Sequence, residues 1–434
     1  MNRTLILFVC VLLGTDAQSA EEPIETILKN LKPGSAVLLP KARIQDAKGN
    51  VIQTPIRHRD YCNKMVYAPE RKTALYAGGS HQTWRSNDVW EFDLASNTWT
   101  RLFAPDGGNH AHIKSTLYNV IRREIRDPKY KMTEKQKTDF EQSQKWWKEN
   151  VVLKEGHITT RNGGPVMPAH TWDGVTYDPL ARRLIWASGA GPGGRIPHYH
   201  ARLMEIPVKE VAKKLDPDYS NAWMFDPKAK MWRQQKSKGE KPRLAGMGAT
   251  LHYIPELKKS IYYVAATNVS PGDYGMWTYD AVENQWARLK PNNGEKISTL
   301  VHRMDQAPLA EQQVAYSSKH GKLVAVHKTK TFVYDVKKNE WSKVAEDERI
   351  YGHDARSVFA YDESADAFLL IYPRGRTPLA SFSLATNKWT VLKPAGTPVP
   401  TRRYRNYMGY YDPIHQVTVL ADGTDRVWVY RHQK

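Results

Sequence analysis

The amino-acid sequence predicts an all-β fold, a six-bladed β-propeller with a helical insertion between blades one and two. Three observations support this prediction. A unit of four short strands recurs along the chain, its copies lie roughly 50 residues apart, and the strands are rich in β-branched and aromatic residues bounded by Gly, Pro, Asn and Asp. One such unit cannot bury both of its faces alone, so neighbouring units must pack around a common axis.

The first copy of the unit is the clearest. We expect its strands at 65–67, 74–77, 89–93 and 97–99, with Gly78-Gly79 after the second strand and Trp99 in the fourth. Later copies keep this order and close on Trp232, Trp286, Trp341 and Trp389. The sixth copy stops after the strand at 427–430, which would leave an open sheet edge. A strand expected at 35–39 is the natural donor of the missing fourth strand.

The glycine pair, the aromatic-Asp third strand ending at Asp93 and the closing Trp99 resemble the kelch repeat, in the superfamily that includes galactose oxidase. The resemblance covers residues 58–432 and is most specific in the first copy, because later copies lack the glycine pair. It implies a kelch-type propeller with its functional site near the mouth of the central axis.

The chain divides into three expected parts. Residues 1–20 read as a secretory signal peptide, because Arg3 precedes a short apolar run at 5–13 and small residues follow up to Ala20. Residues 21–57 supply the closing strand, and residues 58–434 form the propeller. The apolar run is too short to span a bilayer, so we expect a secreted protein without a transmembrane segment.

Two insertions interrupt the repeat. Residues 104–168 are expected to be helical, with an amphipathic helix at 133–150 that starts with Thr133 and Gln136 as a capping box. A seventh blade in this insertion is the alternative, but it contains no aromatic-Asp strand. Residues 189–220 read as a loop rich in Gly, Pro and His, which follows the second strand of blade two.

Charge limits the class of partner. The chain carries a formal net charge of +19, which creates a positive field able to attract nucleic acid, anionic lipid or acidic polysaccharide. Export makes nucleic acid an implausible partner, so we expect an acidic polysaccharide or another anionic glycan, bound by a monomer. Only Cys62 remains after removal of the signal peptide, so no internal disulfide is expected.

Candidate site residues come from the segments before each first strand and after each second strand, which meet at one mouth of a propeller axis. The proposed catalytic residues are His170, His200, Tyr199 and Tyr274. The proposed substrate-binding residues are His58, Arg195, His198, His353, Arg356 and Arg405. His and Tyr suit proton transfer, and Arg suits a carboxylate. The competing interpretation is structural, because the resemblance implies that polar residues before the first strand brace neighbouring blades.

Three functions agree with these residues. The first is a lyase that cleaves a uronate-containing polysaccharide by β-elimination, with His170 or His200 as base, Tyr199 or Tyr274 as acid, and arginine on the carboxylate. The second is a non-catalytic propeller that binds a glycan or a protein. The third, suggested by the galactose oxidase resemblance, is a copper radical oxidase that would use Cys62 and the Tyr199-His200 pair. The sequence assigns no cofactor, and metal ligands drawn from several blades stay open.

Overall fold

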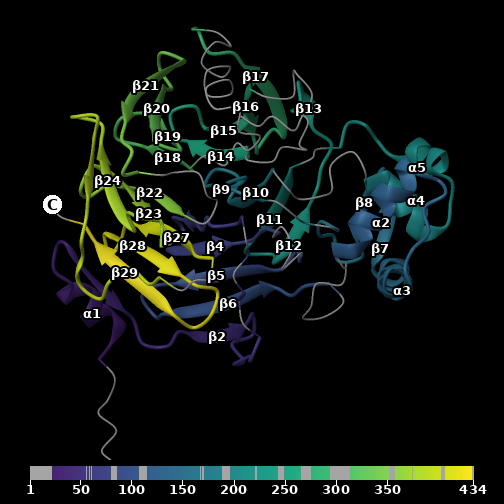
Figure 1. Ribbon diagram of the computed structural model, residues 1–434, viewed down its shortest axis with the longest axis horizontal. Helices are drawn as coiled ribbons and strands as arrows, with labels where there is room; N and C mark the ends of the chain where they lie inside the picture. The colour runs from purple at the N-terminus through teal and green to yellow at the C-terminus, as the bar shows by residue number, and fades with distance from the viewer. Residues whose placement is uncertain are drawn as a thin grey trace, which may run out of the picture.

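The computed structural model describes residues 22–54, 56–57, 59, 61–79, 86–106, 115–166, 168, 171–187, 196–219, 222–242, 249–264, 275–293, 313–350, 357–373, 375–401 and 406–432. Within these residues the chain forms six sheets of four or five strands, arranged around one axis (Figure 1). The first strands of neighbouring blades contact one another in a closed ring, so they are the innermost strands. The fold is therefore the expected six-bladed β-propeller.

Blades one to three follow one another along the chain. From the axis outward, the strands of blade one are β3 (Val66–Ala68), β4 (Thr73–Tyr76), β5 (Val89–Asp93) and β6 (Thr98–Phe103). Those of blade two are β9 (Val175–Asp178), β10 (Arg183–Trp186), β11 (Trp223–Asp226) and β12 (Met231–Arg233). Those of blade three are β14 (Ala249–Ile254), β15 (Lys259–Val264), β16 (Gly275–Asp280) and β17 (Gln285–Leu289).

Blades four to six complete the ring. Blade four contains β18 (Gln313–Ser317), β19 (Lys322–His327), β20 (Lys330–Asp335) and β21 (Glu340–Glu346). Blade five contains β22 (Val358–Asp362), β23 (Ala367–Ile371), β24 (Leu379–Ser383) and β25 (Lys388–Val391). Blade six contains β27 (Met408–Asp412), β28 (Val417–Ala421) and β29 (Val427–Arg431) from its own copy of the repeat.

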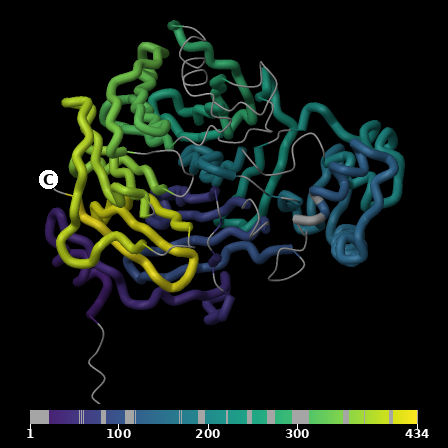
Figure 2. Tube along the Cα trace, viewed as in Figure 1, coloured from purple at the N-terminus to yellow at the C-terminus, as the bar shows by residue number. Residues whose placement is uncertain are grey.

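The fourth strand of blade six is β1 (Ser35–Leu38), from the other end of the chain. It pairs antiparallel with β29, with Ala36 opposite Tyr430 and Leu38 opposite Trp428, so the two ends of the described chain lie side by side (Figure 2). The short helix α1 (Ile24–Asn30) precedes it, and the Arg431 guanidinium donates to the Leu28 carbonyl at 2.9 Å. The ring is thus closed non-covalently by the N-terminal segment.

Three short strands extend the outer edges of blades, a feature that the repeat does not predict. They pair parallel to the fourth strand of a blade: β2 (Arg43–Asp46) with β6, β13 (Lys238–Gly239) with β17, and β26 (Ala395–Gly396) with β1. These strands cover edges that would otherwise expose unpaired backbone groups.

The repeat aromatics form the packing core of each blade. Within one blade, the third-strand aromatic packs against the closing tryptophan, as Tyr279 does on Trp286 with ring centroids 4.4 Å apart and Phe92 on Trp99 at 4.7 Å. Both tryptophans are buried. Truncating a buried tryptophan of this kind to alanine costs about 3–5 kcal/mol, so these aromatics are structural residues.

The helical insertion between blades one and two contains α2 (Ser115–Arg126), α3 (Glu134–Asn150) and the hairpin of β7 (Val151–Lys154) and β8 (His157–Thr160). The Thr133 side chain caps α3, and the capping box with Gln136 is formed. The segment after β10 packs on the same helices, so the two insertions share one core beside the propeller (Figure 1).

The interpretation of residues 189–220 as a loop is wrong for the two helices that this segment contains. Residues 188–195 lie outside the described residues, but α4 (Ile196–Met204) and α5 (Val208–Lys214) follow. The sequence favours α4 because Ile196, Tyr199 and Leu203 fall on one helical face, and Pro197 in the first turn loses no internal hydrogen bond. We missed this period because the glycines before it dominated the interpretation.

Candidate functional site

Two consecutive residues of blade one close the centre of the propeller. The Asn63 side-chain amide reaches across the axis, donating to the Gln313 side chain of blade four at 3.1 Å and to the Ser357 carbonyl before the first strand of blade five. The Asn63 carbonyl accepts from the Gly409 amide of blade six at 3.0 Å. Asn63, Gln313 and Ser357 are all buried.

Lys64 joins the remaining two blades to this centre. Its ammonium donates to the Leu251 carbonyl of blade three at 2.8 Å and lies 3.1 Å from an Asp173 carboxylate oxygen of blade two. The other oxygen of Asp173 lies 2.8 Å from His252 Nε2 of blade three. Asn63 and Lys64 therefore contact the inner strands or their leading segments in all five other blades. We call Asn63, Lys64, Asp173, His252, Gln313 and Ser357 the axial plug.

A pocket of about 290 Å³ lies on the axis, with Lys64 and His252 of the axial plug in its lining. It opens toward the turns that join first to second strands, because Glu363 and Pro413 of those turns also line it. Its lining includes eight aromatic residues of the first strands: Tyr67, Tyr177, Tyr253, Tyr316, Phe359, Tyr361, Tyr410 and Tyr411. We call this cavity the axial pocket.

Several tyrosines of the axial pocket donate their hydroxyls to carboxylates in the turns between first and second strands. Tyr177 donates to Glu70, and Tyr316 donates to Glu256, in each case in the first turn of the preceding blade. Tyr361 donates to Asp366 at 2.7 Å. These bonds fix the rings and link neighbouring blades, so the walls of the pocket are preorganised.

Burial shifts the titration of the groups around the axial pocket. It raises the pKa of Tyr67 and of Tyr411 to about 12, with the Asp412 charge adding to the effect on Tyr67 and Asp362 on Tyr411. Burial also lowers the pKa of Lys64, and the opposing effect of Asp173 is smaller. Burial, and then the Lys64 charge, lower the pKa of His252. The walls are therefore neutral phenols, and the imidazole is held toward its neutral form.

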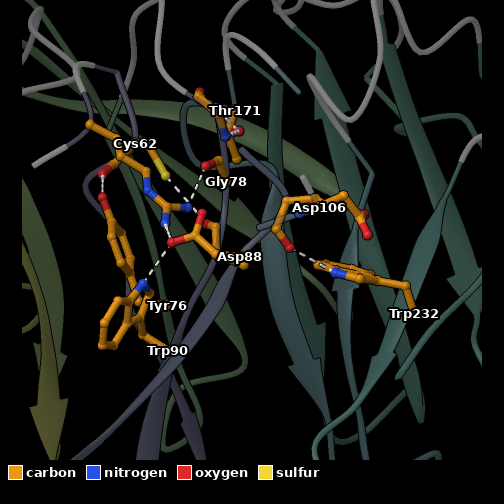
Figure 3. A network of polar contacts seen from close by, with 12 residues as sticks. Cys62, Tyr76, Gly78, Asp88, Trp90, Asp106, Thr171 and Trp232 are labelled. Atoms are coloured by element: carbon orange, nitrogen blue, oxygen red, sulfur yellow. Dashed lines mark hydrogen bonds and ion pairs between the residues drawn. The ribbon is translucent and has the colours of Figure 1, made fainter. Parts of the chain in front are cut away.

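A second buried network supports blade one near the other mouth of the axis (Figure 3). The Asp88 carboxylate accepts from the Arg59 guanidinium at 2.8 Å and from the Trp90 indole at 2.7 Å, and Arg59 also donates to the Gly78 carbonyl. Arg59 and Asp88 are buried, so removing either one would leave an uncompensated charge at a cost of about 3–5 kcal/mol. This geometry gives Arg59 a bracing role.

Gly78 is required by its surroundings in this network. Its φ is +138°, and a Cβ built on it would lie 2.4 Å from Cys62 Sγ and 2.9 Å from Thr171 Oγ1. The Cys62 thiol is buried and donates to the Ala77 carbonyl at 3.4 Å. The glycine pair thus allows the second strand of blade one to approach the segment that leads into blade two.

Most of the site residues proposed from the sequence fall outside the described residues: His58, His170, Arg195, Tyr274, His353, Arg356 and Arg405. Their roles stay predictions. The described members of the set are His198, Tyr199 and His200, and all three lie on α4, in the insertion beside the propeller (Figure 1). They were proposed to line the axis mouth, and none of them lines the axial pocket.

Tyr199 and His200 are part of the core of the insertion. Tyr199 is fully buried, and His200 accepts a hydrogen bond at Nδ1 from the Trp147 indole at 3.1 Å. Burial, with a smaller contribution from Lys214, lowers the pKa of His200 to about 4. A neutral imidazole that accepts at Nδ1 carries its proton on Nε2. This environment gives both residues a packing role, and their catalytic roles stay predictions.

Lys64, His252 and Gln313 of the axial plug were missed because sequence reasoning selected His, Arg and Tyr residues in the segments outside the strands. His252 and Gln313 lie within first strands, and Lys64 lies two residues before one. The sequence signal that could have identified them is a polar residue within the apolar pattern of an innermost strand. Only the ring of blades reveals that these residues meet.

The described residues contain no group of three His, Cys, Asp or Glu side chains placed to hold a metal ion. Among the same residues, no helix has the length and hydrophobicity needed to cross a membrane. No family model matches the chain, and no curated protein matches it.

Proposed function

We propose that the protein is a secreted carbohydrate-binding propeller that takes the end of a glycan chain in its axial pocket. The observation that carries the proposal is the axial pocket itself, which is walled by aromatic rings from first strands around the axis and has the axial plug at one end. A cavity of about 290 Å³ is at the small end of ligand sites, which suits a chain terminus rather than an internal segment.

Aromatic walls favour a sugar because the faces of pyranose rings carry C–H groups that pack on aromatic rings, while sugar hydroxyls need polar partners. The axial pocket supplies both kinds of group. Tyr67 and Tyr253 are partly exposed in its lining, and Thr176 and His252 provide polar atoms. Rigid tyrosines lose little entropy on binding, which favours affinity in a small site.

The net charge of +19 favours a glycan of the acidic class, because the field of the whole protein attracts a polyanion before its end enters the pocket. The proposed lyase activity on such a polymer rests on residues that lie outside the described ones or, for Tyr199 and His200, are buried in the core of the insertion, so the binding function is the better supported of the two. The binding experiment described below also tests whether the polymer is cleaved.

We also propose that the chain is a divergent member of the kelch group of propellers. Support comes from the closing tryptophans, which recur in five blades, and from the glycine pair of blade one, in which Gly78 adopts a backbone conformation that other residues rarely take. The loss of that pair from the later blades accounts for the weakness of the resemblance at the sequence level.

Calorimetric titration with a panel of neutral and uronate-terminated oligosaccharides tests the binding function. Wild-type protein should bind at least one of them, and Tyr253→Ala should weaken that binding about tenfold, equivalent to about 1.4 kcal/mol. Tyr130→Ala is the matched control, because Tyr130 is a partly buried tyrosine of the helical insertion, and it should bind as the wild type does.

Two results would contradict the proposal. One is absence of binding across the panel, and the other is equal binding by the wild type and Tyr253→Ala. Absorbance of unsaturated uronates should be followed in the same samples. An increase in this absorbance would show that the protein is also a lyase. The same increase with Tyr253→Ala would place the lyase activity away from the axial pocket.

A further inference from the structure

Lys64 and His252 are the basic side chains in the described lining of the axial pocket. Their ammonium and imidazole nitrogens lie 3.3 and 3.4 Å apart, so the two groups are side by side. Asp173, which contacts both of them, is not part of the described lining. The Lys64 ammonium therefore borders the cavity, whereas its ion-pair partner, the Asp173 carboxylate, does not.

The opening of the axial pocket has no basic side chain in its described lining. Glu363 lines it, and the Tyr177 and Tyr316 hydroxyls donate to Glu70 and Glu256 in the turns nearby. The basic side chains that border the pocket are therefore those of the axial plug. A ligand with one negative group places that group innermost.

One carboxylate, that of Asp173, serves both basic groups of the axial plug. Lys64 and Asp173 are the charged groups that act on His252 among the described residues. Burial lowers the pKa of Lys64 even though Asp173 lies beside it, which means that one carboxylate does not replace the lost hydration of the ammonium. A second carboxylate in the pocket would supply that compensation and would also favour the protonated form of His252.

We propose that the axial pocket selects a glycan end unit that carries a carboxylate, and that Lys64 and His252 bind this carboxylate. The ligand class is a terminal uronic acid. The proposal rests on the glycan-binding function above and adds to it the residues that read the acid group. The sequence analysis assigned this task to arginines in the connections between strands, Arg195, Arg356 and Arg405, which lie outside the described residues.

Proton linkage follows from this arrangement. The lowered pKa of His252 favours the neutral imidazole in the empty pocket, and a bound carboxylate raises that pKa. Binding then takes up a proton at His252. Affinity should rise as the pH falls through the interval between the pKa of the bound form and that of the empty form.

Calorimetry with two sugars that differ only at the acid group tests the proposal. Methyl β-glucuronide should bind the wild type about tenfold more tightly at pH 6 than methyl β-glucoside does, and the difference should shrink at pH 8. Titrations in two buffers of different ionisation enthalpy should show proton uptake with the glucuronide alone. His252→Gln should abolish this uptake and bring the affinity for the glucuronide toward that for the glucoside.

The wild-type measurements keep the test valid where a variant of the axial plug fails to fold. Equal affinity for the two sugars, without proton uptake, would overturn the carboxylate site and leave glycan binding intact. Acetate that binds as tightly as the glucuronide would support the carboxylate site and contradict sugar binding. Failure of all three probes to bind would overturn both proposals.

Discussion

At the scale of single residues, the environment of each polar side chain decides its role more than its chemical type does. His200 and His252 show this contrast. Both are buried imidazoles with lowered pKa values, but His200 accepts from Trp147 inside the insertion core, whereas His252 contacts Lys64 and Asp173 and lines the axial pocket. Sequence reasoning selected His200, because a His-Tyr-His run after glycines stands out and a lone histidine in a strand does not.

His200 should make the protein sensitive to acid. The unfolded chain binds a proton at this residue near pH 6.5, whereas the folded chain does so only near pH 4, so the unfolded state binds more protons between these values. The contribution of neutral His200 to the free energy of unfolding is therefore fully present above about pH 6.5. It is lost as the pH falls toward 4, and its upper limit is about 3 kcal/mol.

Chemical denaturation at a series of pH values measures this effect. The free energy of unfolding of the wild type should fall more steeply between pH 6.5 and 4 than that of His200→Gln, which cannot take up the proton. His198→Gln is the control, because His198 lies on the same helix and is only partly buried. Parallel curves for the wild type and His200→Gln would show that His200 is not the responsible group.

At the scale of elements, the propeller depends on a strand borrowed from the N-terminal segment. β1 pairs with β29 on one side and with β26 on the other, so its removal would open the edge of blade six. We expect a chain that lacks residues 22–39 to unfold several degrees below the chain that begins at residue 22. A thermal unfolding scan of the two chains checks this.

The truncated chain also allows a rescue experiment. A synthetic peptide of residues 22–41 should restore the midpoint by adding its strand to the free edge, and the same peptide with Val37→Pro should not, because proline cannot donate within a ladder. Identical midpoints for the truncated and longer chains would show that β1 does not contribute to closure.

The elements also show which parts of the structure the sequence can predict. The period of the repeat and the closing tryptophans are local signals, and they were sufficient for six blades and for the donor strand at the N-terminus. The parallel edge strands β2, β13 and β26 carry no repeat signal, because each is only two to four residues long. The helix α4 was missed because Gly and Pro before it masked a short apolar period.

At the scale of the whole molecule, the candidate site is a product of ring closure. Asn63 and Gln313 are 250 positions apart, and Lys64 and His252 are 188 apart, so no local pattern links them. The repeat predicts an axis, but it does not predict which side chains meet on it. Six blades, each ordinary in its own packing, together produce one preorganised aromatic pocket with a charged end.

The location of the ligand tests this account most directly. A crystal structure of the protein soaked with a uronate-terminated oligosaccharide should show the terminal sugar in the axial pocket, between the rings of Tyr67 and Tyr253, with its carboxylate at Lys64 and His252. Density for the sugar at the opposite mouth of the axis, with the axial pocket holding only water, would contradict the account.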